Sequence, residues 1–112
     1  MRMFIVVACI MAICLNSTLA FCNPPKDIAV TISGENIDII VTHPVSNPSE
    51  HYIKTVKVSV NGVLLVQQTF FQQAGNEQRA RYSIPGLKKP SDVSVEADCS
   101  MYGSLVKTAR VE

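Results

Sequence analysis

Short runs of alternating apolar and polar residues recur along most of the chain. This period of two is typical of β-strands that bury one face, and turn-forming residues separate the runs about every ten residues. The expected strands cover residues 28–32, 37–42, 55–60, 63–71, 79–84, 93–99 and 105–111. No run after the N-terminal segment has a helical period. Seven short strands with these turn signals predict an all-β fold, a seven-stranded immunoglobulin-like sandwich of two sheets.

The connections between the expected strands carry residues suited to tight turns. Ser33-Gly34-Glu35-Asn36 separates the first two runs and predicts a hairpin. Asn61-Gly62 separates the third run from the fourth, and both residues tolerate the positive φ of a type I′ turn. A polar stretch over residues 72–77 is expected to be a loop, and Pro85-Gly86 ends the fifth strand.

The N-terminus has a different composition, which predicts export. Arg2 precedes an apolar run over residues 3–15, and Thr18 and Ala20 supply the small residues before a cleavage point. We therefore interpret residues 1–20 as a signal peptide and residues 21–112 as a single domain, located in the periplasm or outside the cell. The apolar run is shorter than the roughly 20 residues that span a bilayer, so a retained membrane helix is the weaker alternative. No integral membrane segment is expected once the signal is removed.

A lipid-anchored form is a further alternative, because Cys22 lies just after the apolar run. Phe21 is too bulky for the small residue that a lipoprotein signal places before its cysteine, which disfavours this alternative.

Charge excludes one class of partner. The 112-residue chain has 10 basic and 9 acidic residues and a net charge of +1. Neither a basic stripe nor an interleaving of basic and aromatic residues occurs, so we expect no nucleic-acid binding. The sequence indicates no particular protein partner or electron donor.

Three side chains near predicted strand ends are candidate metal ligands. His43 follows the second strand and precedes Pro44, His51 lies just before the third strand, and Cys99 ends the sixth. Imidazole and thiolate are ligands for iron, zinc and copper. Sequence spacing alone does not bring these residues together, and hydrogen-bonded histidines with a structural cysteine remain the simpler interpretation.

The fragments around these residues resemble the iron domain of the superoxide reductases, the neelaredoxin and desulfoferrodoxin family. The resemblance rests on His43-Pro44, on Glu50-His51-Tyr52-Ile53 and on Cys99 followed by Gly103, and it extends from about Asn23 to Leu105. In that family four histidines and one axial cysteine hold an iron ion that reduces superoxide to peroxide. The resemblance implies iron as the cofactor, with His43, His51 and Cys99 as three of the five ligands.

The chain departs from the family at the other two ligand positions. Tyr102 stands where the family has a histidine after the cysteine, and Asn23 corresponds to the remaining histidine. Cys22 takes the place of a lysine that is common in the family. The resemblance therefore implies an incomplete site with weakened or lost iron binding. We assign no catalytic residue and expect no efficient superoxide turnover.

The same correspondence suggests a second hypothesis. Of four cysteines, only Cys22 and Cys99 lie outside the predicted signal peptide. Because an exported domain of this size is a common setting for a disulfide, these two are a candidate bridge across the former site. The bridge would consume the only thiolate, so it excludes iron. The chain would then be a non-catalytic, disulfide-tied sandwich that acts as a binding or structural module without a cofactor.

Overall fold

The computed structural model describes residues 24–101 and 103–112, and all of the regular secondary structure in this part of the chain is β-strand. The seven strands are β1 (Asp27–Ser33), β2 (Asn36–Thr42), β3 (Ile53–Val60), β4 (Val63–Thr69), β5 (Glu77–Ser83), β6 (Ser91–Cys99) and β7 (Ser104–Val111). Their number and positions confirm the all-β prediction, with boundaries close to those expected from the alternation.

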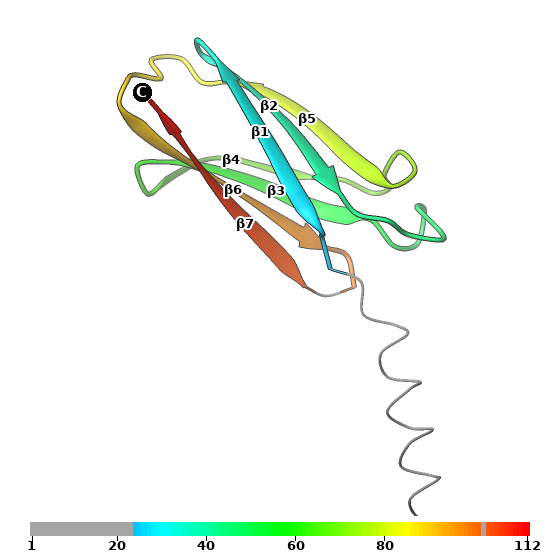
Figure 1. Ribbon diagram of the computed structural model, residues 1–112. Helices are drawn as coiled ribbons and strands as arrows, with labels where there is room; N and C mark the ends of the chain where they lie inside the picture. The colour runs from blue at the N-terminus through cyan, green and yellow to red at the C-terminus, as the bar shows by residue number, and fades with distance from the viewer. Residues whose placement is uncertain (1–23, 102) are drawn as a thin grey trace, which may run out of the picture.

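The strands form two antiparallel sheets that pack face to face (Figure 1). One sheet has the order β1-β2-β5 and the other the order β4-β3-β6-β7. The chain changes sheet after β2, after β4 and after β5, as strands do in immunoglobulin-like sandwiches. Antiparallel register pairs Ile39 of β2 with Val30 and Ala80 on either side. The predicted sandwich is therefore confirmed.

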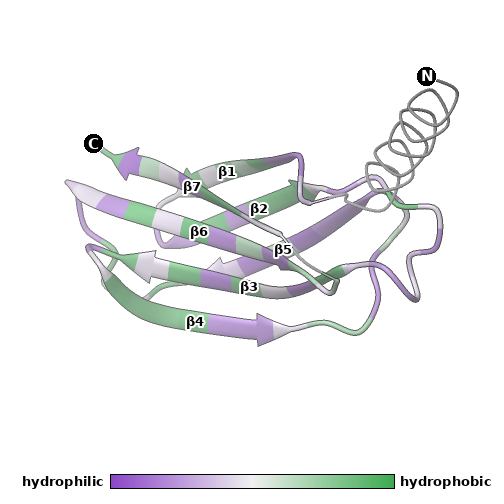
Figure 2. Cartoon of the chain, turned by 90° about the horizontal axis from the view of Figure 1, so that it is seen from below, coloured by the Kyte–Doolittle hydropathy of each residue, from purple (hydrophilic) through white to green (hydrophobic). Residues whose placement is uncertain are grey.

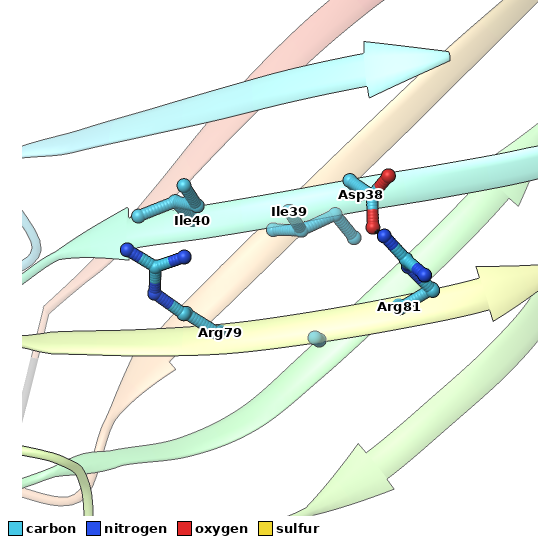
Figure 3. A pocket seen from close by; sticks show the side chains of 6 residues that line it. Asp38, Ile39, Ile40, Arg79 and Arg81 are labelled. Carbon is cyan, nitrogen blue, oxygen red and sulfur yellow. Dashed lines mark hydrogen bonds and ion pairs between the residues drawn. The ribbon is translucent and has the colours of Figure 1, made fainter. Parts of the chain in front are cut away.

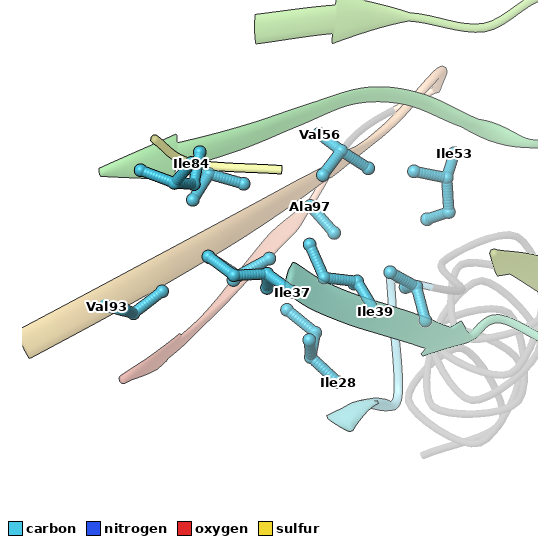
Figure 4. Close-up of a cluster of buried hydrophobic side chains, with 11 residues drawn as sticks. Ile28, Ile37, Ile39, Ile53, Val56, Ile84, Val93 and Ala97 are labelled. Atoms are coloured by element: carbon cyan, nitrogen blue, oxygen red, sulfur yellow. The ribbon is translucent and has the colours of Figure 1, made fainter. Parts of the chain in front are cut away.

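The core lies between the sheets and consists of the apolar side chains that alternate inward. Colouring by hydropathy shows the alternation along the strands (Figure 2). Figure 4 shows the cluster, in which isoleucine and valine predominate. Its buried members are Ile28, Ile37, Ile39, Val41, Ile53, Val56, Val58, Ile84, Val93, Val95 and Ala97. Branched aliphatic side chains suit a pleated, buried surface, so one set of residues both favours strands and fills the core.

Residues with positive φ form the tight turns. Asn61 has φ of 49° and Gly62 has φ of 83°, the pair of conformations that a type I′ turn between β3 and β4 requires. Gly103, in the turn between β6 and β7, has φ of 95°. A Cβ atom at this position would lie 2.6 Å from the Cβ of Pro24. The turn after β6 is therefore closely packed against the segment that precedes β1.

We expect Gly103→Ala to lower the free energy of unfolding by about 2–4 kcal/mol, because strained backbone and overpacking each cost about 1–3 kcal/mol. Chemical denaturation with urea measures the change. Gly75→Ala is the matched control, since Gly75 also has positive φ (62°) but has open space where an added Cβ would lie. An equal loss in both variants would show that the contact with Pro24 contributes nothing.

The predicted signal peptide, Cys22, Asn23 and Tyr102 lie outside the described residues. Within the described ranges, the protein has no helix with the length and apolar character needed to cross a membrane.

Candidate metal centre

Each candidate ligand occupies an inward-facing position at the end of a strand. His43 follows β2 and lies two residues after the buried Val41, so its side chain is on the same face of the sheet. Cys99 ends β6 and lies two residues after the buried Ala97, again on the inner face. His51 lies just before β3. β2 belongs to one sheet, whereas β3 and β6 belong to the other. The apolar core therefore gives way to two imidazoles and a thiol at one end of the sandwich, between the sheets.

The three side chains meet although they are distant in sequence. One potential ligand atom from each of His43, His51 and Cys99 lies within 4.8 Å of the other two. Nε2 of His51 is 3.0 Å from Sγ of Cys99. The two imidazole rings are 4.8 Å apart between centroids and nearly perpendicular, with an interplanar angle of 84°. His43 is fully buried and Cys99 is 8% exposed, whereas His51 is half-buried. The structure thus brings together the three residues that the sequence indicated.

Local hydrogen bonds set the position of each candidate ligand. The backbone N–H of His43 donates to the carbonyl of Asn76 at 2.8 Å. Asn47 begins a tight turn before β3, and its carbonyl accepts from the backbone N–H of His51 at 2.9 Å. The backbone N–H of Cys99 donates to the carbonyl of Gly103 at 2.9 Å, which closes the turn after β6. Backbone pairing of Cys99 with Ile53 aligns the end of β6 with the start of β3.

Gln73 is the residue that sequence reasoning missed. Its side chain is buried, with 6% exposure, in the connection between β4 and β5. Its Oε1 accepts from the backbone N–H of Ile53 at 3.0 Å and lies 3.0 Å from Nδ1 of His43. Its Nε2 donates to the carbonyl of His43 at 2.7 Å and to that of Gly75 at 2.9 Å. One side chain therefore links the end of β2, the start of β3 and the β4–β5 loop.

These contacts fix the proton on His43. A backbone N–H can only donate and a carbonyl can only accept, so the contacts with Ile53 and Gly75 settle which end of the Gln73 amide is oxygen. Oε1 can only accept, and Nδ1 of His43 must therefore carry the hydrogen that the two atoms share. In the neutral ring the lone pair then lies on Nε2, which is the nitrogen that could ligate a metal.

Charged side chains on the outward side of β3 and β6 form a cluster near the candidate metal centre. Nζ of Lys57 lies 3.3 Å from a carboxylate oxygen of Glu96 and 3.7 Å from one of Asp98. Burial raises the pKa of Asp98, with a further increase from Glu96 and an opposing effect from Lys57. The hydrogen bond to Glu96, with the charges of both acids, raises the pKa of Lys57. Because these groups point away from the core, they form a surface network rather than part of the ligand cluster.

Cys99 is a free cysteine in the structure. The Cys22–Cys99 disulfide that the sequence suggested is therefore not seen, and Cys22 itself lies outside the described residues. Instead of a disulfide, Sγ of Cys99 has the imidazole of His51 as its neighbour. The positions suggested for Asn23 and Tyr102 also lie outside the described residues and remain predictions.

Two surface cavities lie away from this centre. One, of about 380 Å³, lies over β2 and β5 and is lined by Asp38, Ile40, Arg79 and Arg81 among others (Figure 3). Arg81 pairs with Asp38, and Arg79 pairs with Glu77. The second, of about 460 Å³, lies between β1 and β7. Neither of these two cavities is lined by a candidate ligand.

The architecture defines a class of protein: an immunoglobulin-like sandwich that gathers two histidines and one cysteine between its sheets. No protein-family model and no curated protein matches the chain. Several solved structures, however, are similar to the chain. A superoxide reductase from Giardia intestinalis is 21% identical, with a TM-score of 0.65 over 79% of this chain and 99% of that one.

Further structures extend the comparison. A hypothetical protein from Pyrococcus horikoshii is 18% identical, with a TM-score of 0.56 over 82% of this chain and 91% of that one. The neelaredoxin superoxide reductase from Ignicoccus hospitalis is 15% identical, with a TM-score of 0.51 over 80% of each chain. At these identities the similarity establishes a shared fold, and this chain has the fold of the superoxide reductases.

The donor set does not fit a complete superoxide reductase iron shell. The whole chain contains only two histidines, so one copy cannot supply the four imidazoles that the resemblance implies. Both histidines are already in the cluster with Cys99. Any metal bound here by one chain therefore has at most two imidazole ligands.

Proposed function

We propose that this chain is an exported domain of the superoxide reductase type that binds one metal ion through His43, His51 and Cys99. The observation that supports it most strongly is the convergence of the three ligand atoms within 4.8 Å at the end of the core. The fold of the superoxide reductases adds support, because structures with that fold in the comparison carry the superoxide reductase name. Export rests on the composition of residues 1–20 alone.

The cluster has the chemistry of a metal site. Thiolate and neutral imidazole are the protonation states that bind metals, so binding must displace the proton shared by His51 and Cys99. Gln73 already holds His43 in the tautomer that a metal bound at Nε2 requires. The proton between His51 and Cys99 has to leave when a metal binds.

Iron is held weakly in this proposal and superoxide turnover is not efficient. At most two imidazoles are available, so an iron ion here lacks the ring of nitrogen ligands implied by the resemblance. The domain is best described as a metal-binding derivative of the superoxide reductase fold, in which the cysteine and two histidines are retained.

We expect the triple variant Cys22→Lys/Asn23→His/Tyr102→His to bind ferrous iron more tightly than the parent chain. The substitutions restore the residues that the resemblance assigns to these positions. Anaerobic titration with ferrous iron measures the affinity, and two added imidazoles should raise it by about 100-fold or more, since even residues beyond the ligands change metal affinity by 10–100-fold.

Adding Cys99→Ser to the triple variant is the matched control and should remove the gain. If the triple variant binds ferrous iron no better than the parent, the correspondence of Asn23 and Tyr102 with lost ligands is wrong. If neither protein binds any metal, the proposed function itself fails.

A further inference from the structure

The cluster differs from a complete iron shell in the number and softness of its ligands, and this difference indicates the metal. We propose that His43, His51 and Cys99 form a copper site that binds copper in preference to iron and zinc. The inference rests on the proposed function, because it requires the same three side chains to be metal ligands.

The first support is the donor set. Two imidazoles and one thiolate are the ligand set of trigonal copper sites, whose further ligands are weak and distant. Copper(I) is satisfied by few ligands and favours sulfur, whereas ferrous iron in sites of low coordination prefers carboxylate oxygen beside its imidazoles. The cluster identified in the described residues contains no carboxylate. Asp98, the nearest acid along β6, is engaged on the outer face by Lys57.

The second support is geometric. Metal bonds to imidazole nitrogen and thiolate sulfur are about 2.0–2.3 Å long, so three ligand atoms arranged trigonally around one ion are roughly 3.5–4 Å apart. The three ligand atoms lie within 4.8 Å of one another, so side-chain shifts of about 1 Å or less would close the site. Nearly perpendicular rings, at 84°, let His43 and His51 approach a common point without stacking.

The third support is burial. His43 is fully buried and Cys99 is 8% exposed. Few water molecules can complete the shell of an ion buried here, which suits copper(I) in a trigonal set of soft ligands better than ions that need more ligands. Among divalent ions the general order of stability also places copper above zinc and iron. The soft thiolate therefore disfavours isolated ferrous iron, and the small number of ligands together with the affinity order favours copper over zinc.

The test is an anaerobic competition with copper(I) alone against a chromophoric copper(I) chelator, using the full chain with reduced thiols. Other cysteines also bind copper, so the starting protein carries Cys9→Ser/Cys14→Ser/Cys22→Ser and retains only Cys99. We expect one copper(I) per chain. Further substitution of Cys99→Ser should weaken binding by about 100-fold or more, and His51→Ala by about 10–100-fold, the range of effects seen around metal sites.

The same protein is then challenged with ferrous iron and with zinc. The proposal predicts that neither ion displaces copper at tenfold excess. Displacement by zinc or iron would overturn the copper assignment and leave the proposed metal site intact. Copper binding that is unchanged by Cys99→Ser would also overturn it. If none of the three metals binds, the proposed function fails together with the inference.

Discussion

Replacing Gln73 with leucine is expected to destabilise the domain by about 3 kcal/mol, because each buried polar group left without a partner costs about 1–3 kcal/mol. The substitution removes hydrogen bonds to the backbone of Ile53, to the ring and carbonyl of His43, and to the carbonyl of Gly75. Leucine has a similar volume, so the loss isolates the polar contribution. Urea denaturation of the metal-free protein measures the change in the free energy of unfolding.

Gln72→Leu is the matched control, since Gln72 is the exposed neighbour in the same loop. We expect it to change stability by about 0.5 kcal/mol or less, as surface substitutions do. If Gln73→Leu lowers the free energy of unfolding by less than about 1 kcal/mol, the hydrogen bonds described around His43 are not formed.

Gln73 also orients His43 and sets the tautomer that the proposed metal site requires. Without it, the ring can adopt either tautomer, and metal affinity should fall by about 10–100-fold, the effect of removing a partner of a metal-bound histidine. NMR of ¹⁵N-labelled, metal-free protein provides an independent readout. The parent chain should show His43 protonated at Nδ1, and Gln73→Leu should show a mixture of tautomers.

Truncation of the core at Ile39→Ala is expected to have the largest effect on stability, about 3–4 kcal/mol, within the range of 2–5 kcal/mol for such deletions. Ile39 is 1% exposed and lies in the central strand of its sheet, between β1 and β5, facing the other sheet. Because small domains are stable by only about 5–15 kcal/mol, the variant should approach the limit of folding. Thermal and urea denaturation measure the loss.

Ile40→Ala is the control for the same strand. Ile40 is the next residue, half-buried, on the outer face beside Arg79 (Figure 3). We expect a loss of about 1 kcal/mol or less, the usual size for a substitution outside the core. Equal losses at both positions would contradict the assignment of inner and outer faces of β2.

The strands were predictable because their alternation reflects the sandwich directly. Ile37, Ile39 and Val41 occupy one parity of β2 and are all buried in the core, so the pattern and the packing have the same cause. Asn61-Gly62 was predictable for a similar reason, since few residues tolerate two successive positive φ values. Strand ends were less well defined: β3 begins at Ile53 rather than Thr55, and a register shift between those residues interrupts the alternation.

The meeting of the ligands could not be predicted from spacing. His43 and Cys99 come from different sheets, and alternation does not specify which strands share a sheet. The resemblance to superoxide reductases supplied that information. Gln73 carried no signal, because a glutamine in a polar loop looks solvent-exposed, and its burial depends on how the β4–β5 loop folds over His43.

The proposed metal site requires Cys99 as a ligand. The most direct test is a free-thiol count with intact mass and metal content on the protein isolated from the compartment to which it is exported. We expect a mass without residues 1–20, both remaining cysteines as thiols, and about one metal ion per chain that shields Cys99 from alkylation. A mass lower by two hydrogens, with neither free thiols nor metal, would show that a disulfide between Cys22 and Cys99 has closed the site.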